Sequence, residues 1–541
     1  MKIRRIASML LILAMSLGLI TGCGAKKKDT VKVEGLPDHT VTLTVGIPQK
    51  ATVTDYDDNA FTNYLEKAAN VEMEFVYFSS SESEYKQQLT LMCGAGEDLP
   101  DVILGFSFSH YIVNQYGEDG YFIDLTNYIE AYGKNYKAQL ENLDEETRNY
   151  ITEKGKNTND GCTYGMPRVA CTAIDQLQSM MYINQTWLNN LGLPVPRTLE
   201  ELEKTLEAFK TQDPNKNGVA DEIPMLGKTA IINYLINAFV RYDQNNFNVT
   251  DGKVWDPIKT DEFRQALIYA NGLVKKGLYS NLSFSISSNT EYKTLISPTD
   301  GPSKVGVFVG HHETMTNAST DALDHFTALP ALSDATGKGG YTMYATPGVT
   351  WAAYITNSCE YPAAAMNLLD QFYLDETMTR QRHGEKGVDW IYEEGDNAYG
   401  TKSYAKAVNS EAFFSGNSTW CFNACGIMTH WNYLLTAQEG TGRIAQASRL
   451  QTEQWNIIQN GKMPEETAEN LVYTSDEYEI REEYAGTANS FISVETIYFV
   501  SGEKDPSNDN EWNTFISTLD GLNRAKLMEV CQNAYTRQQS K

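Results

Sequence analysis

The stretch Val41-Thr-Leu-Thr-Val-Gly-Ile47 alternates apolar with polar side chains, the pattern of a β-strand that buries one face. A helical pattern follows at residues 60–70, a second strand pattern at 71–78 and a second helical pattern at 84–93. The turn Gly94-Ala-Gly-Glu-Asp-Leu-Pro100 then leads into a third, apolar strand that ends at Leu104. Strands and helices therefore alternate, which predicts parallel strands joined by crossover helices and hence an α/β fold.

The same alternation resumes downstream. Strand patterns lie at residues 180–183, 304–310 and 351–356, and helical patterns lie at 184–191, 199–210, 263–276, 361–372 and over most of the chain from about 436 onward. A chain of 541 residues is long enough for two or three domains, each with a core of its own.

The N-terminus has the features of an export signal. Lys2, Arg4 and Arg5 precede an apolar run over residues 6–20, which is shorter than the roughly 20 residues that span a bilayer. The run closes with Ile20-Thr-Gly-Cys23, which resembles the lipobox of bacterial lipoproteins. This resemblance implies a signal peptide at residues 1–22, a palmitate-bearing lipid on Cys23 and a tether at 23–38. We therefore expect a protein anchored by lipid to the extracellular face of the cell membrane, with an ordinary signal peptide as the alternative.

Charge and motifs exclude several classes of function. The formal net charge of −26 repels phosphate backbones, so no nucleic acid partner is expected. The sequence contains no Gly-x-Ser-x-Gly elbow, no His-Glu-x-x-His motif and no Gly-x-x-x-x-Gly-Lys-Ser/Thr loop, so we predict that the protein is not an enzyme. The 70 acidic residues leave a pair of catalytic carboxylates possible, and an extracellular glycosidase therefore remains an alternative.

The cysteines do not define a disulfide framework. Of the 8 cysteines, Cys23 is assigned to the lipid, and the odd number that remains cannot all pair. We expect most of them to be small buried apolar residues, and a Cys421–Cys425 disulfide stays open.

The segment Asp213-Pro-Asn-Lys-Asn-Gly-Val-Ala-Asp-Glu222 places oxygen-bearing side chains at alternate positions before a glycine turn. This arrangement suits a hard cation with oxygen ligands and begins like an EF-hand loop, but its twelfth position is Pro224 instead of Glu. We predict a structural Ca²⁺ held by Asp213, Asn215, Asn217, the Val219 carbonyl, Asp221 and Glu222. An Asx-rich turn without a metal is the alternative.

Several segments in this order resemble one protein family. The segments are Gly96-Glu-Asp-Leu-Pro-Asp-Val-Ile103, Tyr164-Gly-Met-Pro-Arg168, residues 182–194, the Asp213 loop and residues 263–278. Together they are similar to the extracellular solute-binding lipoproteins of ABC sugar importers, of the family 1 type, in the large Gram-positive branch that carries a calcium-loop motif. The similarity covers most of the first half of the mature chain and is loose in the second half.

The resemblance implies a two-lobed periplasmic-binding-protein-like α/β fold of type II, with a ligand cleft between lobes joined by crossing strands. We expect residues 39–170 and 346–400 in lobe 1, and 171–345 and 401–541 in lobe 2. The implied function is capture of a carbohydrate, an oligosaccharide in particular, for delivery to ABC permease subunits by a monomer that contacts the membrane through its lipid only. A surface sensor that is not coupled to import is the alternative.

Sugar sites combine aromatic platforms with planar polar groups. On this basis we predict ligand contacts from side chains next to the expected lobe crossings and glycine-rich loops. The candidates are Trp351, Trp390, Trp420, Trp431, Arg168, His311 and Glu313. Core packing of the tryptophans, a structural salt bridge for Arg168 and a solvated loop for His311 and Glu313 are the alternatives.

Overall fold

The first sheet has six strands and contains the alternating stretch that starts at Val41. In a computed structural model its strands are β1 (Val41–Pro48), β2 (Val71–Phe78), β3 (Val102–Phe108), β4 (Met166–Ala170), β11 (Gly348–Ile355) and β14 (Gly426–Met428). Their order in the sheet is β14-β4-β11-β3-β1-β2. The strand β1 pairs in parallel with β2 and β3, which confirms the crossover pattern predicted for the N-terminal region. The strand β11 is antiparallel to both β3 and β4, so the sheet is mixed.

The structure describes residues 33–51, 53–96, 98–172, 180–227, 229–243, 247–286, 288–310, 316, 321–342, 348–409, 418–421, 424–440 and 443–540. The predicted residues Cys23, His311 and Glu313 lie outside them. The stretches Met1–Gly35 and Leu36–Lys541 form separate units, and all features below belong to the second. Among the described helices, none is long and apolar enough to cross a membrane.

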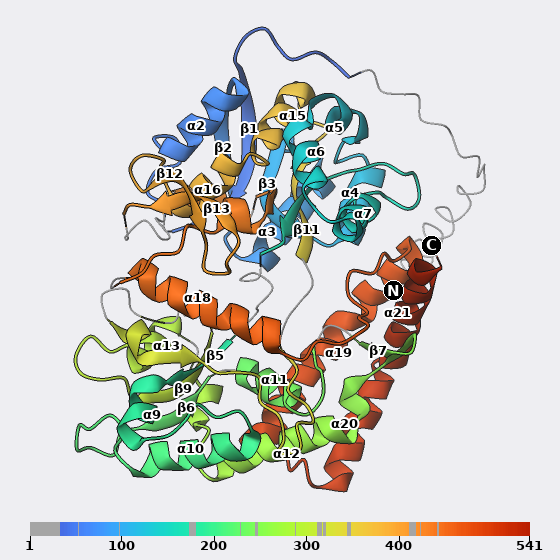
Figure 1. Ribbon diagram of the computed structural model, residues 1–541. Coiled ribbons are helices and arrows are strands. Elements are labelled where there is room, and N and C mark those ends of the chain that lie inside the picture. Colours follow the sequence, from blue (N-terminus) through green and yellow to red (C-terminus); the bar gives the residue numbers. More distant parts are fainter. Residues whose placement is uncertain are drawn as a thin grey trace, which may run out of the picture. The chain divides into compact units, whose positions relative to one another are not determined.

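Helices and one hairpin cover the first sheet and form with it the first lobe (Figure 1). These elements are α2 (Ala60–Ala69), α3 (Glu82–Ala95), α4 (His110–Glu118), α5 (Thr126–Tyr132), α6 (Lys134–Glu141), α7 (Glu145–Lys154), α15 (Pro362–Gln371), α16 (Asp375–His383), α17 (His430–Tyr433), the short helix η5 (Ser418–Cys421) and the antiparallel hairpin β12 (Trp390–Asp396)–β13 (Lys402–Ala407). Because β14 pairs with β4, the first lobe extends beyond the predicted boundary at residue 400 to at least Met428.

The second sheet has four strands in the order β10-β5-β9-β6, and forms the second lobe with the helices around it. Its strands are β5 (Met180–Asn184), β6 (Ile223–Leu226), β9 (Val305–Gly310) and β10 (Phe326–Ala328). The surrounding elements are α9 (Gln185–Leu191), α10 (Leu199–Thr211), α11 (Thr229–Asn237), α12 (Asp261–Lys275), α13 (Asn289–Ile296), α18 (Arg443–Asn460), α19 (Ser475–Ser501), α20 (Asp509–Gly521), α21 (Arg524–Gln539), the hairpin β7 (Asn248–Thr250)–β8 (Lys253–Trp255), and the short helices η1 (Pro257–Lys259), η2 (Asn281–Phe284) and η3 (Ala322–His325).

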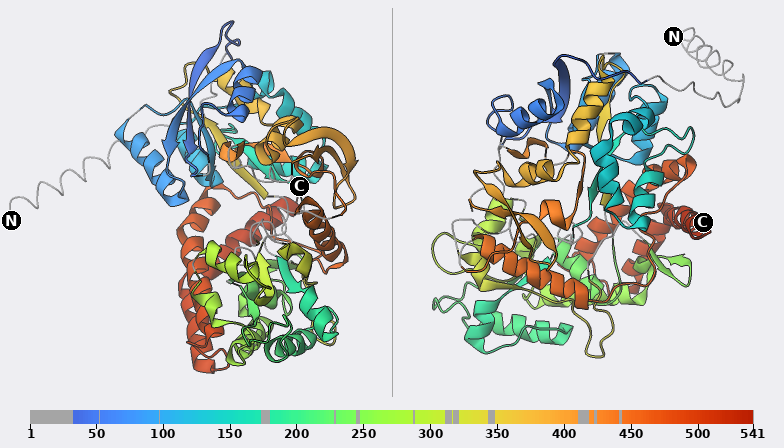
Figure 2. Two further views of the ribbon diagram at one scale, coloured as in Figure 1. Left: turned by 90° about the vertical axis from the view of Figure 1, so that its left-hand side faces the viewer. Right: turned by 45° about the horizontal axis from the view of Figure 1, so that its top comes forward.

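Amphipathic helices pack their apolar sides together and form the core of the second lobe. In α10 the apolar positions Leu199, Leu202, Leu206 and Phe209 follow helical spacing and are all buried. A capping box between Thr198 and Glu201 starts this helix, and the Asp213 loop follows its end. The C-terminal helices, red in Figure 2, add Phe499, Phe515 and Leu527 to the same core.

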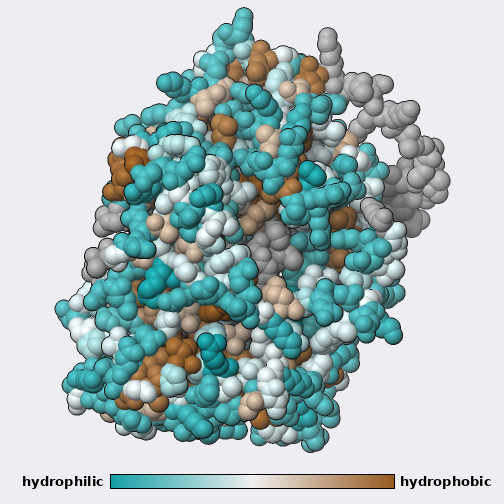
Figure 3. Space-filling model, in the orientation of Figure 1, coloured by the Kyte–Doolittle hydropathy of each residue, from teal (hydrophilic) through white to brown (hydrophobic). Residues whose placement is uncertain are grey.

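The surface is mainly polar. Hydrophilic residues dominate the face shown in Figure 3, and the brown residues form separate patches. Cys421 and Cys425 are buried free thiols, so the disulfide left open by the sequence is not formed in this structure.

A buried ion pair within the second lobe joins the start of α21 to the segment that follows β8. The Arg524 Nε lies 3.0 Å from the Asp256 Oδ2, and both side chains are 3% exposed. We predict that Arg524→Met lowers the free energy of unfolding by about 3–5 kcal/mol, because it leaves the Asp256 carboxylate buried without its cation. Lys156→Met breaks an exposed pair with Glu153 and should cost less than about 1 kcal/mol. Urea unfolding measures both, and equal losses would contradict a special role for the buried pair.

Candidate functional site

The helix α18 belongs to the second lobe. The Arg449 guanidinium donates hydrogen bonds to the carbonyls of Leu323 at 2.6 Å and Phe326 at 3.0 Å. The Glu453 carboxylate accepts from the Thr327 hydroxyl at 2.7 Å and the Ala328 amide at 2.9 Å. These bonds hold α18 against β10 and η3, so the helix is fixed to the second sheet.

The opposite side of α18 meets the first lobe. The Thr452 hydroxyl donates to the Ala398 carbonyl at 2.9 Å, and the Ser448 hydroxyl accepts from the Gln438 amide at 3.2 Å. The Trp455 ring lies 5.2 Å from the Tyr399 ring and 5.8 Å from the His430 ring, centroid to centroid. An aromatic cluster from both lobes therefore lies on this face.

An apolar cluster continues the contact, and we call it the interlobe cluster. It includes Ala170, Met378, Tyr399, Met428, Tyr433 and Leu434 from the first lobe and Met180, Tyr182, Phe308, Leu450 and Ile458 from the second. The Gln454 amide of α18 donates to the Tyr182 hydroxyl beneath it. Amide and aromatic groups thus stand together where the lobes meet, which is the chemistry that carbohydrate sites use.

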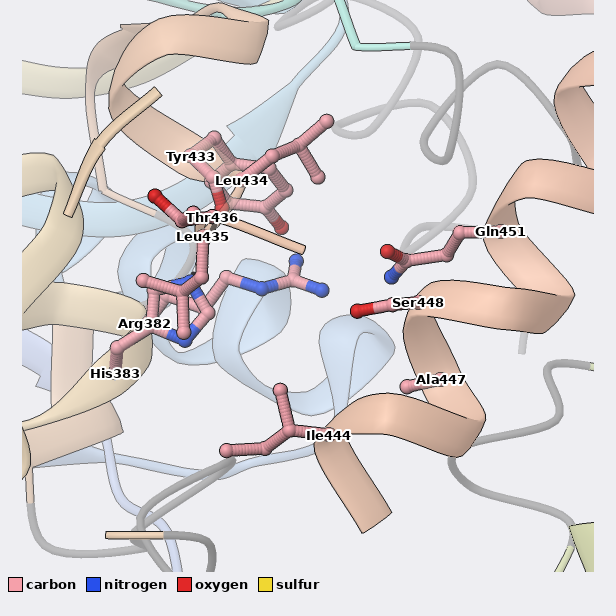
Figure 4. Close-up of a pocket in the computed structure, with 10 residues that line it drawn as sticks. All are labelled: Arg382, His383, Tyr433, Leu434, Leu435, Thr436, Ile444, Ala447, Ser448 and Gln451. Atoms are coloured by element: carbon pink, nitrogen blue, oxygen red, sulfur yellow. Dashed lines mark hydrogen bonds between the residues drawn. The ribbon is translucent and has the colours of Figure 1, made fainter. Parts of the chain in front are cut away.

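A small hollow lies between α18 and the first lobe (Figure 4). It is lined by Arg382, His383, Tyr433, Leu434, Leu435, Thr436, Ile444, Ala447, Ser448 and Gln451. The Arg382 guanidinium points toward Ser448 and Gln451 of α18, and its carbon lies 4.0 Å from the centre of the Tyr433 ring. The enclosed space of about 10 Å³ has room for about one water molecule. A molecule larger than water would therefore fit here only if the two lobes separated.

Arg168 lies at the edge of the same face. It sits on β4 opposite Thr350 of β11 and Gly426 of β14. Its Nη2 donates to the Met428 sulfur at 3.6 Å, and its buried Nε has no hydrogen-bond partner. Arg168 thus forms no structural salt bridge with the described residues.

Three of the four predicted tryptophans are core residues. Trp351 is 2% exposed, Trp390 is 0% and Trp420 is 1%. Trp390 donates its indole N–H to the Gly384 carbonyl at 3.0 Å, and Trp420 packs against Phe61 and Phe75. Because protein atoms cover these rings, the structure does not support the predicted role of Trp351, Trp390 and Trp420 as sugar platforms. Trp431 is only partly buried, and its indole donates to the Asp375 carboxylate at 3.1 Å.

A second contact between the lobes joins His110, which packs on Trp351 in the first lobe, to Tyr478 in the second. The His110 ring of α4 lies 5.1 Å from the Trp351 ring and 5.3 Å from the Tyr478 ring of α19. The His110 Nε2 and the Tyr478 hydroxyl are buried and have no hydrogen-bond partner among the described residues. Burial, together with the positive charge of Lys154, lowers the pKa of His110 to about 4.

The Asp213 loop folds as an Asx-rich turn. The Asp213 carboxylate accepts from the amides of Asn217 and Gly218, each at 3.2 Å. Asp221 accepts from the Asn215 and Asn217 side chains and pairs with Lys304 at 2.9 Å. The positive φ angles of Asp213, 46°, and Gly218, 75°, allow the chain to fold back on itself. Among the described residues, no three His, Cys, Asp or Glu side chains are placed to hold a metal.

The residues of α18 were not predicted from the sequence. A signal for them exists, because Ser448, Gln451, Thr452 and Trp455 share one side of a helix and present polar and aromatic groups together. Tyr399 and His430 carry no local signal, since only the tertiary fold brings them against Trp455.

A comparison with protein families decides the assignment. Residues 50–379 match the family described as bacterial extracellular solute-binding protein. The chain belongs to this family. Its fold is the two-lobed mixed α/β fold that the sequence predicted, and this family comprises binding proteins, not enzymes.

Two of three curated relatives of this solute-binding protein are named for a saccharide. The fructooligosaccharide ABC transporter substrate-binding protein FusA of Streptococcus pneumoniae is 27% identical over 363 residues, which cover 62% of this chain and 63% of FusA. The polygalacturonan/rhamnogalacturonan-binding protein YtcQ of Bacillus subtilis is 24% identical, with the same shares covered. Lipoprotein LipO of B. subtilis is 22% identical over 70% of this chain and 72% of LipO. The chain thus spans 63% of the length of FusA and of YtcQ.

Solved structures extend the similarity of this solute-binding protein over most of the chain. The structure of S. pneumoniae FusA in complex with kestose has a TM-score of 0.73 at 19% identity, and the superposition covers 92% of this chain and 99% of the solved FusA chain. A FusA EF-hand mutant in complex with fructo-nystose gives the same TM-score of 0.73. At this identity the similarity establishes the fold alone.

The buried His110 makes stability depend on pH. Its pKa is about 4 in the folded protein and about 6.5 in an unfolded chain, so the unfolded state binds more protons below pH 6.5. We predict that lowering the pH from 7.5 to 5 removes about 2 kcal/mol of the free energy of unfolding through His110.

The His110→Asn variant should lose this share of the pH dependence. The exposed His39→Asn serves as the control and should keep it. Urea unfolding at both pH values measures the effect, and the same slope in wild type and His110→Asn would contradict the assignment.

Proposed function

We propose that this protein captures an oligosaccharide between its two lobes and delivers it to the permease subunits of an ABC transporter. The family membership and the names of FusA and YtcQ support a saccharide ligand and a transporter partner. The chain passes back and forth between two separate sheets, one in each lobe. This arrangement supports capture of the ligand by a hinge motion that brings the two lobes together. A monomer suffices for this role, since both lobes come from one chain.

The observation that carries the proposal is the face shared by α18 and the first lobe. Trp455, Tyr399 and His430 form an aromatic group there, with ring centroids 5.2–5.8 Å apart across the lobes. We place the sugar beside Trp455, with Arg168 at the edge of the same face to donate hydrogen bonds to it. Trp431 lies in the first lobe near this face and remains a proposed contact, as do His311 and Glu313.

We also propose a structural Ca²⁺ in the Asp213 loop. The Glu222 Oε1 is buried without a hydrogen-bond donor, and burial together with the Asp213 and Asp221 charges raises the pKa of Glu222. A cation would neutralise this carboxylate, and the side-chain oxygens of Asp213, Asn215 and Asn217 with the Val219 carbonyl complete an oxygen donor set. The EF-hand named for FusA supports a metal at a loop of this kind.

An anchor through Cys23 fits the proposed role. The name of lipoprotein LipO supports lipidation in this group of proteins, and the family description supports an extracellular location. A lipid on Cys23 would keep the binding body near the permease, with residues 23–38 as the tether. The membrane would then be contacted through the lipid alone.

The Trp455→Ala variant tests the proposed site. We predict that wild-type protein binds fructooligosaccharides or oligogalacturonides by calorimetry, and that Trp455→Ala weakens binding about tenfold through loss of a stacking contact. Trp255→Ala is the matched control, because this indole donates to Thr250 in the β7–β8 hairpin, away from the α18 face. Unchanged affinity in Trp455→Ala would show that the sugar does not bind beside Trp455. Failure of the wild type to bind any oligosaccharide would overturn the proposed function.

Removal of calcium tests the loop. We predict that a chelator lowers the melting temperature of the wild type by several degrees, and that Asp213→Ala abolishes this calcium dependence. Asp334→Ala is the control, since Asp334 accepts from the Thr336 and Lys338 amides in a turn that is not part of the proposed metal loop. Differential scanning calorimetry with and without calcium measures the melting temperature of each variant. Identical wild-type melting curves in calcium and in chelator would exclude a structural metal.

A further inference from the structure

The Arg168 side chain carries a charge that the described protein does not neutralise. An arginine stays protonated and presents five N–H donors. Of these donors, Nη2 meets only the thioether sulfur of Met428 at 3.6 Å, and the buried Nε meets no acceptor. Among the described residues no carboxylate lies within 4.0 Å of this guanidinium.

The acidic groups on neighbouring elements are already engaged. On α16, which packs against β14, Asp375 accepts from Gln139, Trp431 and Asn432. Its neighbour Glu376 pairs with Arg380 and Lys386, each at 2.8 Å. Asp370 of α15 accepts from the amides of Asn135 and Tyr136. These carboxylates stabilise the first lobe and are not available to Arg168.

The position of Arg168 relates it to the ligand face. Ala170 is two residues further along β4, on the same side of the strand, and belongs to the interlobe cluster. Met428, the contact of Arg168, belongs to the same cluster. Arg168 therefore lies at the edge of the face on which the lobes close, and the guanidinium of Arg382 also points into this face (Figure 4).

A neutral sugar would leave the charge uncompensated. Hydroxyl groups can accept hydrogen bonds from a guanidinium, but closure of the lobes removes the water that otherwise screens it. A carboxylate supplies both the acceptors and the opposite charge, and its planar geometry matches the two parallel N–H donors of arginine.

We propose that the ligand is an acidic oligosaccharide and that Arg168 binds the carboxylate of a uronic acid unit. This inference rests on the proposed function, because it names the class of saccharide that the same interlobe site accepts. Arg168 then acts as a specificity determinant, which admits uronic acid oligosaccharides in preference to neutral ones.

The test compares sugars that differ only in the carboxylate. Trisaccharides of galacturonic, glucuronic and mannuronic acid, each with its methyl ester, are titrated into the mature chain by calorimetry, alongside neutral trisaccharides. We expect one acid to bind about 10- to 100-fold more tightly than its ester. Arg168→Gln should reduce this preference to about threefold or less, whereas Arg168→Lys should retain part of it.

Arg197→Gln is the matched control, because Arg197 is an exposed cation of the second lobe that lines a separate hollow beyond α18. It should leave the preference unchanged. Equal binding of acid and ester, or tight binding of neutral sugars only, would overturn the inference while the proposed function stands. Absence of binding to every saccharide would overturn both. If Arg168→Gln does not fold, as judged by circular dichroism, the acid-to-ester ratio of wild type alone decides.

Discussion

The Arg449 guanidinium and the Glu453 carboxylate fix α18 on the second sheet through four hydrogen bonds to the segment Leu323–Ala328. Everything proposed for the site depends on this attachment. Because it holds one side of the helix, the other side, with Ser448, Thr452 and Trp455, is left to face the first lobe. An aromatic side chain of the second lobe is thereby brought against Tyr399 and His430, which come from the first.

The contact has a consequence for how a ligand enters. The hollow between α18 and the first lobe encloses only about 10 Å³, whereas ligand pockets generally enclose about 300–1,000 Å³. Binding at the proposed site would therefore require the Thr452 and Ser448 hydrogen bonds across the lobes to break and the lobes to move apart. The loss of these two hydrogen bonds costs little, because such bonds exchange with water, whereas separation of the interlobe cluster exposes apolar surface and favours the closed form. In the proposed role, a net charge of −26 would slow the approach of an acidic sugar, and the local charge of Arg168 would set which sugar is held between the lobes.

The sequence predicted much of the fold and less of the site. Local periodicity located β1, β2 and β3 and their parallel pairing, because each pattern lies within one element. It did not place β14 in the first sheet, since a three-residue strand has no period of its own and its pairing with β4 spans more than 250 residues. Trp351, Trp390 and Trp420 were expected at the ligand because tryptophan suits both sugars and cores, and only burial separates the two roles. Arg168 was predicted as a ligand contact from its place in the sequence, but the absence of a hydrogen-bond partner for its Nε among the described residues could be seen only in three dimensions.

A crystal structure of the protein with a bound oligosaccharide tests the central claim most directly, because it shows which lobe supplies each contact. The account predicts sugar density between α18 and the first lobe, with one ring against Trp455, and with side chains of both lobes within hydrogen-bond distance of its polar groups. Sugar held by one lobe alone, for example in the separate hollow lined by Arg197 and Lys462, would contradict it.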